Sequence, residues 1–315
     1  MIRFIGRKLI SVAATMLIVS LLVFLAFAVI PGDPAVHQLG TQATEESVRT
    51  LRHTMGLDRP ILVRYGEWLR AFVSGDMGVS YSYRMPVRSM LAGKLPVTMT
   101  MTVFAFIIML VISVPLGISM AKHAGGRSDT VVTAVNQVFM SVPPFFGGIL
   151  ITYLFGRMLH LFTPGGYVSY NEDAAGFFAY MFFPALAVAL PKCAMAAKLL
   201  KESIMREAGQ DYVRTAYSRG NRTNGVLYGH VLKNALIPVI TFLGMAFVDM
   251  IAGSIIIEQE FNIPGIGRTL LTSISNRDYP VVEAVIMCIA FAAVTVNFAV
   301  DLIYRAVDPR ITEAG

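Results

Sequence analysis

The residues best suited to catalysis are scattered along this chain and form no spacing that an active site requires. Its histidines stand far from one another, at His37, His53, His123, His160 and His230, and no two of them flank a glutamate at metal-binding helical spacing. No glycine-rich loop ends in Lys-Ser or Lys-Thr, and no Gly-x-Ser-x-Gly turn presents a nucleophile. We therefore predict that the chain is not an enzyme and has no catalytic residue, no metal site and no cofactor of its own.

Polar residues inside long apolar runs are the second place to look for function. Asp249 lies near the middle of one such run, where a charge is costly unless it faces a bundle interior or a water-filled path. Phe247 and Ser254 belong to a helical stripe beside it, so we expect these three residues to line a pathway. The alternative is that Asp249 makes only a structural hydrogen bond between helices. Lys192 and Asp301 stand close enough to the ends of their runs to reach the membrane interface.

The third candidate is the segment 211–220, which lies between two long apolar runs. Apolar residues are spaced among its arginines, and the small residues Ala216 and Gly220 stand four positions apart. Small side chains let a partner surface approach closely. We predict that the segment docks a soluble protein through Asp211, Tyr212, Val213, Arg214, Thr215, Ala216, Arg219 and Gly220. The alternative is a solvated basic loop that only fixes membrane topology.

The composition places the chain in a lipid bilayer. Hydrophobic residues make up 55% of it, charged residues 15%, and the mean hydropathy is +0.63, whereas soluble domains carry about 25% charged residues. The runs long enough to cross a membrane are Leu9–Ile30, Val97–Met120, Val131–Phe155, Phe177–Ala197, Ala235–Ile257 and Val281–Tyr304. Lys and Arg concentrate in the connections on the side of both termini, which predicts cytoplasmic termini. The predicted fold class is an all-α membrane protein with six transmembrane helices, and the net charge of +6 is interpreted as a topology signal.

The segment between the first two runs is predicted to form an ordered cap outside the membrane. Thr44 precedes two glutamates and then apolar residues at helical spacing, which predicts a capped helix over Thr44–Met55. A second amphipathic helix is expected over Pro60–Val73, followed by a turn at Gly75–Gly78. The chain therefore divides into a cytoplasmic tip with the first helix (1–30), the cap (31–96), a core of five helices (97–305) that contains the docking loop 198–234, and a cytoplasmic tail (306–315).

Motifs along nearly the whole chain resemble one family of transport proteins. Arg214-Thr215-Ala216, followed by Gly220, resembles the first half of the EAA loop of ATP-binding-cassette (ABC) importer permeases. Further matches to the oligopeptide, dipeptide and nickel branch occur in order at Ile30–Pro34, Gly56–Pro60, Gly75–Gly78, His230–Pro238, Pro264–Arg268, Arg277–Pro280 and Asp308–Ile311. The chain departs from the general loop pattern in its second half, where Leu-Pro is not at the usual spacing and Ile237-Pro238 stands further on. The C-terminal boundary of the docking segment is therefore left open.

This resemblance implies the architecture of a type I ABC importer permease in a bacterial or archaeal plasma (inner) membrane, in contact with membrane lipid and not with nucleic acid. The implied partners are a second homologous permease, two cytoplasmic ATPase subunits that bind ATP and Mg²⁺, and an extracytoplasmic solute-binding protein. Val213 and Ala216 would pack in a groove of an ATPase subunit, while Arg214 and Arg219 would pair with acids on its rim. Peptides are the expected substrate. Nickel or another small solute is the alternative within the family, and an ion-coupled secondary transporter is the alternative outside it.

Overall fold

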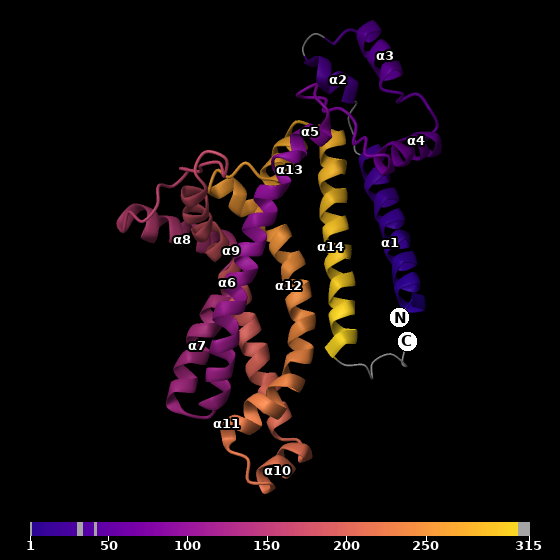
Figure 1. Cartoon of the computed structure of the whole chain (residues 1–315). Helices are drawn as coiled ribbons and strands as arrows, with labels where there is room; N and C mark the ends of the chain where they lie inside the picture. The colour runs from indigo at the N-terminus through magenta and orange to yellow at the C-terminus, as the bar shows by residue number, and fades with distance from the viewer. Residues whose placement is uncertain (1, 30–33, 41–42, 308–315) are drawn as a thin grey trace. The chain divides into compact units, whose positions relative to one another are not determined.

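The structure is a computed structural model that describes residues 2–29, 34–40 and 43–307 (Figure 1). The described residues are helical throughout their ordered elements, and the only strand-like pairing among them is an isolated bridge between Val79 and Pro86. The all-α class is therefore confirmed for this part of the chain. The motif Asp308–Ile311 and all of the motif Ile30–Pro34 except Pro34 lie outside the described residues.

The chain forms two compact units: residues 1–97 with 264–295, and residues 98–263 with 296–315. The first unit contains α1 (Ile2–Val29), α2 (Pro34–Leu39), α3 (Glu45–Thr54), α4 (Ile61–Val73), α5 (Val87–Ala92), α13 (Ile266–Ser275) and the first part of α14 (Tyr279–Val307). The second contains most of α6 (Leu95–Lys122), α7 (Arg127–Ser141), α8 (Pro144–Ile151), η2 (Thr152–Met158), α9 (Ala174–Ala208), α10 (Asp211–Ser218), α11 (Thr223–Val226), η3 (Leu227–Val231) and α12 (Leu232–Glu260). This division differs from the predicted segments, because residues 264–295 group with the N-terminal part of the chain.

Several of these helices are long and apolar enough to cross a membrane. Among the described residues they are Ile5–Phe27, Val87–Lys122, Ala174–Ala208, Thr223–Glu260 and Tyr279–Ile303, and the bent pair Arg127–Ser141 with Pro144–Met158 would form a sixth crossing if it counts as one span. The chain is thus a multi-helix membrane protein. Six crossings and cytoplasmic termini stay predictions.

The third predicted run, Val131–Phe155, is not one continuous helix. The axis turns by 103° between α7 and the helical segment that follows it. Val142 and Pro143 both have extended backbone, with ψ of 118° and 143°. Two consecutive prolines explain the break, because proline lacks the N–H for the helical hydrogen bond and disfavours helical conformation in the residue before it.

Helix α9 is continuous over 35 residues although Pro184 and Pro191 lie inside it. Both prolines are buried, and half of the most apolar window of this helix is enclosed by the protein. Packing against α7, α8 and α12 surrounds it. In such a bundle, neighbouring helices compensate for the backbone hydrogen bonds that the two prolines remove.

The two amphipathic helices expected in the cap are present in the first unit as α3 and α4. Thr44 caps α3, since its hydroxyl accepts a hydrogen bond from the Ser47 backbone N–H at 3.2 Å, and the Ser47 side chain returns a bond to the Thr44 backbone. The turn after α4 is held by the buried Asp278, which accepts hydrogen bonds from the Ser80 hydroxyl and from the Tyr81 backbone N–H at 2.9 Å. The cap segment 44–83 is therefore an ordered structure.

Candidate functional site

Helix α10 carries most of the predicted docking segment, and it is mounted on the hydrophobic core of its own chain. Val213 and Ala216 are 1% and 6% exposed. They pack in one cluster with Leu200, Ile204, Val226, Val231, Ala235 and Val239. A helix of eight residues is too short to be stable by itself. Its stability therefore comes from this packing against α9, α11, η3 and α12.

This packing corrects one expectation from the sequence. Val213 and Ala216 were predicted to pack in a groove of another protein, whereas the structure buries both inside this chain. Positions three apart share one face of a helix, but this periodicity does not say which molecule covers that face. Here the covering residues come from the adjoining ends of α9 and α12.

Tyr212 adds a polar attachment between α10 and the long helices on either side. Its hydroxyl donates a hydrogen bond to the Glu207 carboxylate at 2.9 Å and accepts one from the Asn234 side chain at 3.0 Å. Partial burial raises the pKa of Tyr212, so the phenol remains protonated and able to donate at neutral pH. Glu207 belongs to α9 and Asn234 to α12, so one side chain links both helices to α10.

Gly220 ends α10 through its backbone conformation. Its φ is +81°, which side-chain-bearing residues rarely adopt, and its N–H donates to the Tyr217 carbonyl at 2.9 Å. The Asn221 side chain also caps this end by donating to the Ala216 carbonyl at 3.0 Å. A Cβ on Gly220 would meet no atom within 4 Å. Within this chain, the glycine thus serves the turn and not a close approach.

The opposite face of α10 is open. The predicted residues Asp211, Tyr212, Arg214, Thr215 and Arg219 are all exposed, and so are Tyr217 and Ser218. Tyr217 is 46% exposed and was not among the predicted docking residues. The sequence feature that could have identified Tyr217 is its aromatic side chain at a helix position away from the apolar face of Val213 and Ala216. Tyrosine and arginine are the residue types that most often dominate the energy of protein interfaces.

Asp249 forms an ion pair across α9 and α12. The Lys192 ammonium lies 2.7 Å from the Asp249 carboxylate, and the two side chains are 20% and 61% exposed. A carboxylate of the neighbouring helix thus holds the Lys192 ammonium. That Lys192 reaches the membrane interface stays a prediction. Asp249 lies in an exposed stripe of α12 whose other members are Thr241, Met245, Ala252 and Ile256.

The structure does not bring Phe247 and Ser254 onto this stripe. Phe247 is half-buried and packs edge-to-face on Phe106 of α6, with ring centroids 5.2 Å apart. Ser254 is fully buried, and its hydroxyl donates to the Ile251 carbonyl at 2.7 Å. The predicted stripe is the face by which α12 packs in its own chain. Ser254 is therefore not placed to line a pathway, while Asp249 and its neighbours occupy the open face.

Comparisons with known proteins agree with this architecture. Residues 113–313 match the family described as the binding-protein-dependent transport system inner membrane component, and residues 1–102 match the family of its N-terminal part. A chain of the MetNI methionine ABC transporter, solved in inward-facing conformations, has a similar fold with a TM-score of 0.55 at 17% sequence identity. That similarity covers 70% of this chain and 96% of the MetNI chain.

Curated relatives are similar over almost their full length. A probable peptide ABC transporter permease of Sinorhizobium fredii is 34% identical over 308 residues, with 98% of each chain covered. A putative peptide transport system permease of Brucella abortus is 35% identical over 305 residues, with 97% of each covered. The glutathione transport system permease GsiC of Salmonella choleraesuis is 30% identical over 311 residues, with 99% of each covered. The chain therefore belongs to the inner-membrane permeases of binding-protein-dependent ABC importers, in their peptide family, as a multi-pass transport subunit of the bacterial inner membrane.

Proposed function

We propose that this chain forms half of the transmembrane pathway of a peptide importer and is driven by ATPase subunits that dock on α10. The observation that carries the proposal is the two-sided construction of this helix. One face is anchored in the chain's own core by Val213 and Ala216, and the other presents Arg214, Tyr217 and Arg219 to solvent. In an importer whose ATP is hydrolysed by separate subunits, the permease needs a segment that is fixed to its own helices and open to those subunits.

The anchoring also suggests how force would pass to the membrane helices. The cluster that holds α10 includes Leu200 and Ile204 of α9 and Ala235 and Val239 of α12. Close-packed interiors transmit displacement because they resist compression. Movement of a docked ATPase would therefore shift α10 together with α9 and α12, which is a rigid-body route between two states of the permease.

Asp249 is the residue that we assign to the pathway. Lys192 pairs with one side of the Asp249 carboxylate, and the side chain still remains 61% exposed. On a membrane helix, that open part would need water or a polar partner outside this chain. A hydrated path at a surface shared with the second permease would supply both. We therefore propose that Asp249 lines the pathway together with Thr241 and Met245, which lie on the same open stripe of α12. Phe247 and Ser254 are not part of this stripe.

Peptides are the substrate class that we propose, because relatives similar over almost their full length are named peptide and glutathione permeases. The remaining partners follow the family pattern: a second homologous permease, two ATPase subunits that bind ATP and Mg²⁺, and a solute-binding protein outside the membrane. Nickel stays the alternative substrate. Among the described residues, no group of three or more His, Cys, Asp or Glu side chains could hold a metal ion, so no residue set argues for it.

Uptake by the reconstituted complex tests the function. The tagged chain is purified with its co-expressed partner subunits and placed in proteoliposomes with the solute-binding protein. We expect uptake of a radiolabelled dipeptide or tripeptide that requires ATP and stops when a non-hydrolysable analogue replaces it. Uptake that follows an imposed proton gradient without ATP would instead identify a secondary transporter. Uptake of Ni²⁺ but of no peptide would contradict the substrate class.

A further inference from the structure

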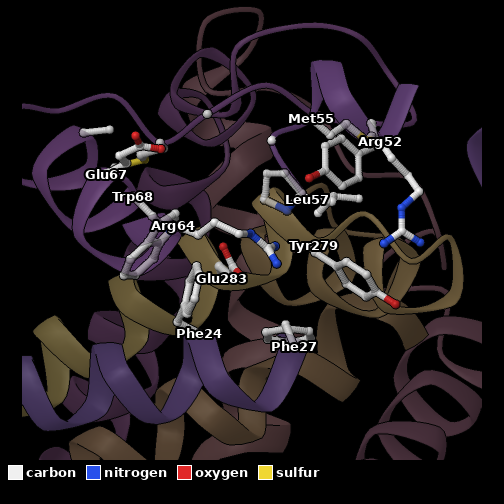
Figure 2. A pocket seen from close by; sticks show the side chains of 16 residues that line it. Phe24, Phe27, Arg52, Met55, Leu57, Arg64, Glu67, Trp68, Tyr279 and Glu283 are labelled. Atoms are coloured by element: carbon white, nitrogen blue, oxygen red, sulfur yellow. The ribbon is translucent and has the colours of Figure 1, made fainter. Parts of the chain in front are cut away.

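The first unit contains a cavity of about 610 Å³ that the transport function above does not use (Figure 2). Its walls come from the end of α1, the segment 52–57, helix α4, the turn 77–81 and the start of α14. Charged side chains of both signs line it, together with an aromatic wall. A mixture of this kind can recognise a small ligand through a few placed polar groups on an apolar surface.

Arg64 places a positive charge at the wall of this cavity. Its guanidinium lies over the ring of Phe24 at 5.8 Å from the centroid. Among the residues that the structure describes, no oxygen accepts a hydrogen bond from it and no carboxylate lies within ion-pair distance. The guanidinium has five N–H donors in a planar arrangement that suits carboxylate or phosphate oxygens. Arg64 is therefore equipped to hold an anionic group that enters the cavity.

Glu283 supplies the opposite charge from the start of α14. Its side chain lines the cavity although the residue is only 8% exposed. A carboxylate offers about four acceptor positions to hydrogen-bond donors. Figure 2 shows the Glu283 carboxylate and the Arg64 guanidinium turned toward each other. A ligand that reaches both would place a hydrogen-bond donor near Glu283 and an anionic oxygen near Arg64.

The aromatic wall is built from the ends of two membrane helices. Phe24 and Phe27 are in the last turns of the candidate span Ile5–Phe27, and Tyr279 begins the span Tyr279–Ile303. Phe24 packs on Trp68 with ring centroids 5.7 Å apart, and Phe27 packs on Tyr279 at 5.5 Å. The cavity therefore lies at the ends of two candidate spans, where the headgroup layer of a bilayer would be expected.

We propose that this cavity is a binding site for a zwitterion, whose anionic oxygens pair with Arg64 and whose ammonium donates to Glu283. Two sources offer that chemistry: the headgroup of phosphatidylethanolamine, and a free peptide with its two charged termini. The position at the ends of α1 and α14 favours the lipid headgroup. Phosphatidylcholine shares the phosphate but its quaternary ammonium has no hydrogen to donate, and phosphatidylglycerol shares the phosphate without the positive charge.

Trp68 provides the test, because it is the only tryptophan of the chain and lines the cavity together with Glu283. The full-length chain in detergent is titrated with the dihexanoyl forms of phosphatidylethanolamine, phosphatidylcholine and phosphatidylglycerol, and separately with dialanine, while the Trp68 emission is followed. The variants are Arg64→Gln and Glu283→Gln, and the matched control is Arg70→Gln, an exposed arginine of the same helix outside the cavity. Monodisperse elution of each variant excludes misfolding.

We expect a saturable emission change with phosphatidylethanolamine. The half-saturating concentration should rise at least about tenfold in both cavity variants, since each loses a charge-assisted hydrogen bond, and should not change in Arg70→Gln. A saturable response to dialanine with the same dependence on Arg64 and Glu283 would assign the site to a soluble zwitterion. The proposal is overturned if no ligand gives a saturable change, if phosphatidylglycerol acts as well as phosphatidylethanolamine, or if both cavity variants respond like the wild type.

Discussion

The Lys192 ammonium and the Asp249 carboxylate meet at 2.7 Å between α9 and α12, yet the two side chains differ in their surroundings. Lys192 is mostly enclosed, whereas 61% of the Asp249 side chain is open. The open part of the Asp249 carboxylate escapes most of the desolvation penalty of a buried ion pair, and its acceptor positions outnumber the single contact with Lys192. The open carboxylate therefore points to a second role at the surface of α12, on the pathway that we propose.

Neutralising this pair separates the two roles. Asp249→Asn leaves the Lys192 cation without its partner, and the double variant Lys192→Gln/Asp249→Asn removes both charges. Because the pathway needs the carboxylate itself, we expect peptide uptake to fall by about tenfold in both variants, with a normal yield of assembled complex. Uptake and yield are measured together. Full uptake by the double variant would show that the pair is only structural.

The burial of Val213 predicts a stability effect that a free surface loop would not show. Val213→Ala should lower the free energy of unfolding by about 1–3 kcal/mol, because it removes buried methyl groups and leaves a cavity. Val213→Asp should cost more, since the charge would be buried without a partner. Thermal unfolding of the purified chain measures both. Ser218→Ala, on the exposed face of the same helix, is the control, and equal melting temperatures for all three variants would contradict the packing.

Two glycines on either side of the α10–α11 turn should respond in opposite directions to alanine. Gly220→Ala should destabilise by about 1 kcal/mol, because alanine is strained at a φ of +81°. Gly225 lies in α11 with open space around it and without a positive φ. Gly225→Ala should therefore be neutral or stabilising, since alanine favours helix by about 1 kcal/mol over glycine. Chemical denaturation of the two variants checks the signs, and a destabilised Gly225→Ala with an unaffected Gly220→Ala would refute the turn geometry.

Sequence patterns predicted those features that depend on neighbours in the chain. The capped helix α3 follows from Thr44 and the residues directly after it. The break at Val142–Pro143 was missed because the apolar run continues through it, although the two consecutive prolines were its signal.

Features that depend on distant residues could not be predicted in this way. Lys192 and Asp249 are 57 positions apart, and their pairing requires the register of α9 against α12. The spacing of Val213 and Ala216 identified an apolar face of α10, but only the packed structure shows that the same chain covers it. For the same reason the stripe beside Asp249 was assigned to the pathway when it is the packed face of α12.

Tyr81 in the first unit should make stability depend on pH in the alkaline range. Burial, with a smaller contribution from the Glu283 carboxylate, raises the pKa of Tyr81 from 10.0 to about 12. The folded protein therefore holds the phenol proton more tightly than the unfolded chain. This stabilisation is complete below pH 10 and is lost as pH rises through the folded pKa. Melting temperatures between pH 9 and 12 should thus decline more for the wild type than for Tyr81→Phe, and parallel declines would contradict the burial.

The central claim is that ATPase subunits dock on the open face of α10, and a charge reversal on that face tests it most directly. Arg214 is 79% exposed, and its only ion pair among the described residues is a 3.7 Å contact with Asp211, which is 97% exposed. Such a surface pair contributes little to folding, so Arg214→Glu should leave the melting temperature unchanged. The control is Arg157→Glu, which reverses an exposed arginine of η2.

The measurement is the amount of ATPase subunit that co-purifies with each tagged variant. We predict that Arg214→Glu retains at least about tenfold less ATPase than the wild type, as expected when a charged interface contact becomes repulsive, while Arg157→Glu retains the wild-type amount. Wild-type amounts of ATPase on Arg214→Glu, together with unchanged ATP-driven uptake, would contradict the assignment of α10 as the docking helix.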